Sequence, residues 1–89
     1  MGIINNLKNI FMPMKELTYG QKAVGITFNP GNNSQVNEIK HASAFIIDLL
    51  AKESLKDGVS PEKLSLLECA IRELQTSQMW AVKAITYQY

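Results

Sequence analysis

The stretch covering residues 60–86 constrains the fold more than any other part of the sequence. Ser60 can cap a helix, Pro61 suits the first helical position because its missing N–H costs nothing there, and Glu62 faces the positive helix end. No glycine or proline interrupts the residues that follow. Apolar side chains recur among them at the three-then-four spacing of a helix face, namely Leu64, Leu67, Ile71, Leu74, Ala81 and Ile85, with Gln78 as the one interruption. This seam predicts a long amphipathic helix.

A second apolar strip runs beside this seam. Its members are Leu66, Ala70, Met79, Trp80, Val82 and Ala84. The seam and the strip together are too wide for one partner helix to cover. A chain of 89 residues also has room for only a thin core, and oligomerisation often supplies the missing buried surface at this size. We therefore expect a homo-oligomer.

A second long helix is predicted between the irregular loop 29–33 and Gly58. The loop 29–33 is Asn-Pro-Gly-Asn-Asn, in which glycine permits a positive φ, and Asn33 or Ser34 can cap a helix that begins at Gln35. Lys56-Asp57-Gly58 should end this helix near Leu55. The expected seam comprises Val36, Ile39, Ser43, Ile46 and Leu50, with Ala42, Phe45 and Leu49 alongside.

The connection between the two long helices is so short that they must fold back antiparallel, seam against seam. No pair of segments has a pattern able to form a sheet. The predicted fold class is therefore all-α, an antiparallel helical hairpin.

Residues 3–18 carry a further amphipathic pattern, which Pro13 interrupts. We expect two short helical pieces with a kink there, followed by a glycine-containing linker over 19–25 and a short extended piece over 26–28. Packing of the first pieces onto the hairpin or a neighbouring subunit is the interpretation that we favour. A membrane-surface helix is the alternative, although its two lysines make a weak basic face.

The predicted organisation is one small domain with two parts. Residues 1–24 form the kinked N-terminal segment and linker, and residues 25–89 form a ligand-binding loop with the helical hairpin.

The charge balance excludes several partners. Nine Lys and Arg oppose eight Asp and Glu, and a net charge of +1 offers no broad electrostatic field for long nucleic acid or an anionic membrane.

Cys69 is the only cysteine, so we expect neither a disulfide nor a zinc site, and a lone cysteine in a helix is usually a small core residue. With no run long enough to span a membrane and no signal-peptide pattern, we expect a soluble, intracellular protein.

Catalysis needs titratable groups that converge, and the sequence shows no such set. His41 is the only histidine and nothing marks it as a general base, so we interpret it as a partly exposed helix residue. Ser60 and Lys63 match a Ser-x-x-Lys pattern, but this match is short and the capping role accounts for it. We expect no enzyme, and no metal or cofactor.

Binding of a small anion has better support. A loop that leads into a helix start presents unpaired N–H groups and a positive dipole end, which together hold phosphates. Lys40 could add a full positive charge, and Phe28 a flat face on which a base could stack. Taken by themselves, the residues favour the plainer interpretation, with Phe28 as a core residue, Pro30-Gly31 as an ordinary turn and Lys40 as a solvated surface residue.

Two motifs carry a resemblance to a known family. The first is Ile26-Thr27-Phe28-Asn29-Pro30 followed by a helix with Ile39-Lys40, and the second is Leu74-x-x-x-x-Met79-Trp80-Ala81-x-x-Ala84-Ile85. Over residues 25–86 the chain resembles the phage anti-CBASS cyclic-nucleotide sponge family, helical-hairpin proteins that share their core with a Thoeris-inhibiting sponge. Residues 1–24 lie outside this resemblance.

The resemblance implies a compact hexamer in the cytoplasm of an infected bacterium. Such proteins bind cyclic dinucleotides such as cGAMP between paired protomers, and many hold cyclic trinucleotides at separate pockets on a threefold axis. They do not cleave the ligand, and its sequestration keeps the CBASS effector inactive. A small module that binds a host protein is the alternative function.

The resemblance also assigns the ligand-binding residues. Phe28 would pack on the base within the segment Thr27, Asn29 and Pro30, and Lys40 would meet the phosphates. The family commonly has tyrosine where this chain has Phe28, so the hydroxyl contact is lost. Arg72 stands where Thr or Ser is usual, and it could serve a trinucleotide site or lie on the surface with Glu68 and Glu73.

Overall fold

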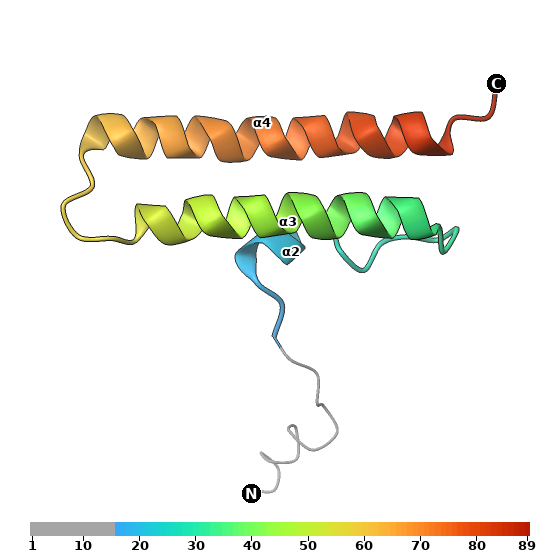
Figure 1. Ribbon diagram of the computed structural model, residues 1–89, viewed down its shortest axis with the longest axis horizontal. Coiled ribbons are helices and arrows are strands. Elements are labelled where there is room, and N and C mark those ends of the chain that lie inside the picture. The colour runs from blue at the N-terminus through green and yellow to red at the C-terminus, as the bar shows by residue number, and fades with distance from the viewer. Residues whose placement is uncertain (1–15) are drawn as a thin grey trace, which may run out of the picture.

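The computed structural model describes residues 16–89, which form three helices. α2 spans Tyr19–Ala23, α3 spans Ser34–Ser54 and α4 spans Pro61–Thr86. α3 and α4 run antiparallel side by side and are joined by a short turn, while α2 lies against α3 (Figure 1). No strand occurs within the described residues, and the all-α helical hairpin predicted from the sequence is confirmed.

The ends of α4 follow the signals that predicted them. The Ser60 hydroxyl accepts a hydrogen bond of 3.1 Å from the Lys63 N–H, and Pro61 occupies the first helical turn with Glu62. Ser60 therefore caps the helix, as predicted, and the Ser-x-x-Lys pattern is a helix start.

The ends of α3 were predicted to within one residue. Asn33 caps the helix, because its Oδ1 accepts from the N–H groups of Gln35 and Val36. Leu55 is the C-cap, and Gly58 adopts a φ of 77° in the turn that follows. In the loop before α3, the positive φ of 50° belongs to Asn32 and not to Gly31, so that detail of the prediction was wrong; asparagine is the side chain that tolerates this region best.

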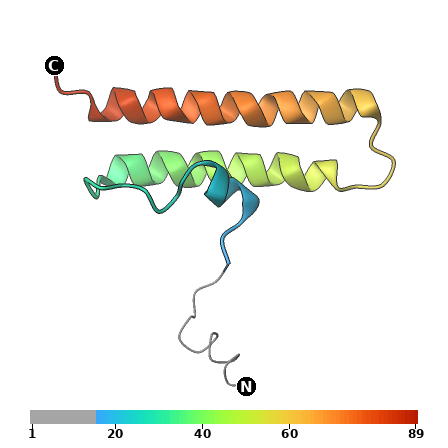
Figure 2. The same cartoon turned by 180° about the vertical axis from the view of Figure 1, so that it is seen from behind.

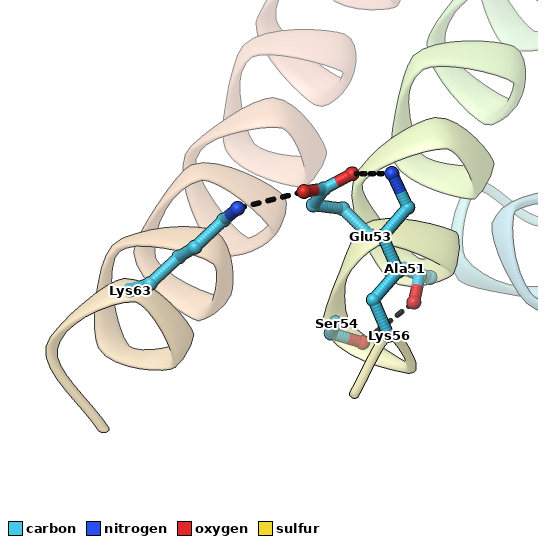
Figure 3. Close-up of polar contacts among 5 residues, drawn as sticks. All are labelled: Ala51, Glu53, Ser54, Lys56 and Lys63. Atoms are coloured by element: carbon cyan, nitrogen blue, oxygen red, sulfur yellow. Dashed lines mark hydrogen bonds and ion pairs between the residues drawn. The ribbon is translucent and has the colours of Figure 1, made fainter. Parts of the chain in front are cut away.

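An ion-pair cluster ties the closed end of the hairpin together (Figure 3). One Glu53 carboxylate oxygen lies 2.8 Å from Lys56 Nζ, and the other lies 2.7 Å from Lys63 Nζ on α4. Hydrogen bonds from Lys56 and Lys63 lower the pKa of Glu53 from 4.5 to about 2. The cluster is partly exposed, so solvent screens it.

The core joins α3 and α4 to the loop that follows α2. The residues buried in its central cluster are Val24, Ala44, Ile47 and Ile71. Partly buried Ala23, Ile26, Leu50, Ala51 and Leu74 pack around them. Ile47 is the only fully buried large side chain among the described residues.

The buried face of α3 differs from the predicted seam. Its buried residues are Val36, Lys40, Ala44 and Ile47, whereas Ile46, a predicted seam residue, is 43% exposed. Apolar residues surround much of α3, so periodicity could not distinguish one face from its neighbour. Lys40 lies on the buried face of α3. Because lysine is usually found at the surface, its presence made this face a poor candidate for the predicted seam.

The predicted linker over 19–25 is wrong, since most of it is helix α2. Thr18 and Gln21 form a capping box, in which the Thr18 hydroxyl accepts from the Gln21 N–H and the Gln21 side chain accepts from the Thr18 N–H. Gly20 is buried against α3. This glycine therefore permits close packing instead of chain flexibility.

The predicted extended piece over 26–28 is also wrong. The chain turns here, with Gly25 at a φ of 62°, and the Phe28 N–H donates 2.9 Å to the Gly25 carbonyl. A tight turn, not a strand, therefore presents Phe28.

Cys69 is exposed on α4, against the expectation of a core residue, because it lies away from the face that meets α3.

The predicted helical pieces over 3–18 lie outside the described residues except for 16–18, which are not helical. No helix in the described part of the chain is long and apolar enough to cross a membrane.

The second apolar strip is largely exposed in the single chain. Its large members Leu66, Met79 and Trp80 are each more than half exposed. This agrees with the chain having more apolar surface than one hairpin buries, and the homo-oligomer remains a prediction.

Candidate functional site

A cavity of about 470 Å³ lies at the open end of the hairpin. The loop before α3, the first turns of α3 and the last turns of α4 meet at this end, as seen from the front and from behind (Figures 1 and 2). The lining residues are Phe28, Asn29, Pro30, Gly31, Asn33, Val36, Lys40, Val82, Ile85, Thr86 and Gln88. Four of the six predicted site residues, Phe28, Asn29, Pro30 and Lys40, are among them.

The loop wall of the cavity is held by its own hydrogen bonds. Asn29 Nδ2 donates 2.8 Å to the Asn33 carbonyl, and the Asn33 N–H donates 3.1 Å back to Asn29 Oδ1. The Asn32 N–H also donates 2.9 Å to the Asn29 carbonyl. Both the Nδ2 and the Oδ1 of Asn29 therefore form hydrogen bonds within the loop, so the role of Asn29 in the site is to shape the loop wall of the cavity.

Lys40 is the most unusual residue of the site. Only 6% of its surface is exposed, and its Nζ donates to the carbonyl oxygens of Gly25, at 2.9 Å, and Phe28. The interpretation of Lys40 as a solvated surface residue is therefore wrong. Two of its three N–H groups hold the turn 25–28 on α3, and the third has no acceptor among the described residues.

Phe28 is 70% exposed, so it is not a core residue either. Its backbone is fixed on both sides, by the bond from its N–H to Gly25 and by the bond that its carbonyl accepts from Lys40. The Lys40 Nζ lies 5.5 Å from the centroid of the ring. A rigid turn therefore presents an exposed aromatic face next to a positive charge.

The opposite wall belongs to the end of α4, which the site prediction missed. Val82 and Ile85 give it an apolar surface, and Thr86 and Gln88 add polar groups. The Thr86 hydroxyl donates 2.9 Å to the Val82 carbonyl. The only signal in the sequence is indirect: an antiparallel hairpin of two long helices must bring the end of the second to the start of the first.

Two predicted site residues lie elsewhere. Thr27 is exposed and does not line the cavity, although it belongs to the same turn. Arg72 is exposed along α4, also away from the cavity, and forms no ion pair with Glu68 or Glu73 in the described structure.

The chemistry of the cavity is that of a binding site. Among the described residues that line it, Lys40 alone is ionisable. His41 is exposed, with Nδ1 2.9 Å from the Asn37 carbonyl, and residues 16–89 contain no group of three His, Cys, Asp or Glu placed to hold a metal ion. An aromatic face, one ammonium group and apolar walls suit a ligand with a flat ring and a negative charge.

A comparison with known families finds a match that covers most of the chain. A family model described as the Acb2/Tad1 hairpin domain matches residues 21–86, a range that contains the cavity loop and both long helices. No curated protein and no solved structure gives a significant match.

Proposed function

The chain belongs to the Acb2/Tad1 hairpin-domain family, the phage anti-CBASS sponge family, and from this membership we propose that it sequesters cyclic dinucleotides such as cGAMP. The family suggests a phage anti-defence protein. In the proposed function the bound messenger cannot activate the CBASS effector, and the protein acts in the cytoplasm of the infected bacterium.

One observation supports this function best: the exposed Phe28 ring and the Lys40 ammonium group lie 5.5 Å apart at the same cavity. Stacking on an aromatic ring is available to any nucleobase. The ammonium group compensates the negative charge of a nearby phosphate. The apolar α4 wall, with Val82 and Ile85, faces the remainder of the ligand.

A symmetric pair of chains would match the ligand. A cyclic dinucleotide has two bases and two phosphates arranged with near two-fold symmetry, and a two-fold dimer contributes two copies of Phe28 and of Lys40. The exposed strip with Leu66, Met79 and Trp80 supplies apolar surface for such contacts. We propose a hexamer built from these pairs, with cyclic trinucleotides bound near Arg72 on a threefold axis.

Binding without cleavage fits the residues that line the cavity. General acid–base chemistry needs a group positioned toward the ligand, and the Lys40 ammonium group instead donates to the Gly25 and Phe28 carbonyls. We therefore propose that the ligand leaves unaltered.

Calorimetry with cGAMP tests the function. We expect binding in the micromolar range or tighter. Heat and phenol treatment of the complex should then release a ligand whose mass equals that of the cyclic compound. The absence of binding, or the recovery of a linear product, would contradict the proposal.

A second function is a protein-interaction module, which the exposed apolar strip also permits. In that case purification from infected cells would recover a stoichiometric protein partner, and the purified sample would contain no nucleotide.

A further inference from the structure

Gln78 is the polar residue that interrupts the apolar seam of α4, and in the structure it lies inside the fold. Its side chain is buried, with only 6% of its surface exposed. Its Oε1 accepts no hydrogen bond from any described residue. A buried carbonyl oxygen without a donor destabilises a fold, whereas leucine at this position would continue the seam. A residue that breaks a local rule at such a cost calls for a role elsewhere.

Gln78 and the lysine of the candidate site line the same small cavity. This second cavity, of about 230 Å³, is lined by Val24, Lys40, Gln78, Met79 and Val82. Within residues 16–89, Lys40 and Gln78 are the polar side chains that line it. Lys40 thus borders both this small cavity and the larger cavity with Phe28.

Each of the two residues lacks one hydrogen-bond partner. Lys40 donates to the Gly25 and Phe28 carbonyls and has a third N–H, and Gln78 has an unused acceptor. The small cavity is open toward solvent and has room for water, and a water there could bridge these two groups.

We propose that Gln78 is a positioning residue for Lys40, acting through a water in the small cavity that joins Gln78 Oε1 to the third N–H of the ammonium group. The ammonium group then has three acceptors, as a buried cation requires. Its position fixes the turn 25–28, and with it the direction of the Phe28 ring. The effect on the ligand rests on the proposed function, but the effect on the turn does not.

Hydrogen exchange of the Phe28 amide, which donates to Gly25, reports on the turn directly. In Gln78→Leu and Gln78→Met this amide should exchange about tenfold faster, because the acceptor for Lys40 is gone. In Gln78→Glu, in which a carboxylate oxygen replaces the amide oxygen as acceptor, protection should persist. Gln75→Leu is the matched control, because Gln75 lies on the same helix and lines neither cavity, and it should leave Phe28 protected.

The stability of the variants separates positioning from packing. Gln78→Leu should melt at the same or a higher temperature than the unaltered protein, since it fills the seam, and yet loosen the turn. If exchange at Phe28 is unchanged in both Gln78→Leu and Gln78→Met, the inference is wrong.

Calorimetry with cGAMP adds the functional readout. Gln78→Leu should bind about tenfold more weakly because the turn is less preorganised. Equal or tighter binding by a variant with a loosened turn would overturn the role of Gln78 in the ligand site. If the unaltered protein binds no cyclic dinucleotide, the proposed function fails, while the exchange result still decides the link between Gln78 and Lys40.

Discussion

The backbone N–H of Gly20 donates a hydrogen bond of 2.7 Å to Oδ1 of Asp48, and this bond fastens α2 to the middle of α3. A Cβ atom at position 20 would overlap the Ala44 carbonyl oxygen and lie 2.8 Å from Asp48 Oδ1. Glycine is therefore the residue that allows the two helices to approach so closely.

Substitution Gly20→Ala should lower the free energy of unfolding by about 1–3 kcal/mol, because α2 must move away from α3. Urea denaturation followed by circular dichroism measures this. Gly31→Ala is the control, because a Cβ there meets nothing within 4 Å. Equal stability of the two variants would show that the contact between α2 and α3 is loose.

Substitution Lys40→Ala should weaken cGAMP binding by about 1–3 kcal/mol, because the positive charge beside the ligand and the donor that holds the turn 25–28 are both lost. It should also leave the Gly25 and Phe28 carbonyls without their donor, although the mass of the oligomer should not change. Calorimetry and light scattering are the measurements. Lys52→Ala removes the same charge from an exposed position in the last turn of α3. A similar loss in both variants would mean that only net charge matters.

Substitution Phe28→Ala should weaken cGAMP binding by about 1–3 kcal/mol through the loss of stacking. The free energy of unfolding should change little, because the ring is mostly exposed. Phe28→Tyr keeps the ring and should retain binding. Calorimetry on the two variants is decisive: if Phe28→Ala binds as well as the unaltered protein, the ring lies outside the site.

Trp80 should act on assembly and not on the fold of the single chain. It is 65% exposed, with Lys83 Nζ 5.6 Å from the ring centroid. Trp80→Ala should keep its helical content but dissociate more readily, by about 2 kcal/mol or more if Trp80 is central to an interface. Light scattering over a range of concentrations measures this. A monomeric unaltered protein at working concentration would exclude the proposed pairing of two Phe28 rings and two Lys40 side chains around the ligand, and would contradict the proposed function.

Glu53 should make stability depend on pH in the acid range. Its pKa is about 2 in the folded protein, against an ordinary value of 4.5, so its contribution to stability is complete above pH 4.5 and is lost as the pH falls through about 2. Glu53→Gln should therefore melt at a lower temperature than the unaltered protein at neutral pH, and the difference should shrink as the pH falls below 4.5 and disappear below about pH 2.

Glu38→Gln is the control for this experiment, because Glu38 is exposed on α3 and forms no ion pair in the described structure. If the difference for Glu53→Gln is independent of pH, the ion pairs with Lys56 and Lys63 do not form in solution.

The sequence by itself determined the two long helices and their antiparallel pairing. Asn33 and Ser60 indicate where α3 and α4 begin, and Gly58 indicates the turn between them. These signals can be recognised in the sequence because capping and chain reversal depend on residues within one turn of each other. Local signals placed Phe28, Asn29 and Pro30 beside the start of α3 and Lys40 within that helix, but it was the family resemblance that assigned these four residues to a ligand site.

The tertiary structure decided which faces meet and what the polar residues do there. The burial of Lys40 depends on carbonyl oxygens from a turn in another part of the chain, and the contribution of α4 depends on where that helix ends beside the loop. From the sequence Gly20 was likewise interpreted as a linker residue, whereas in the structure it packs directly against α3. Periodicity reports on neighbours along one helix, whereas these contacts join residues that only packing brings together.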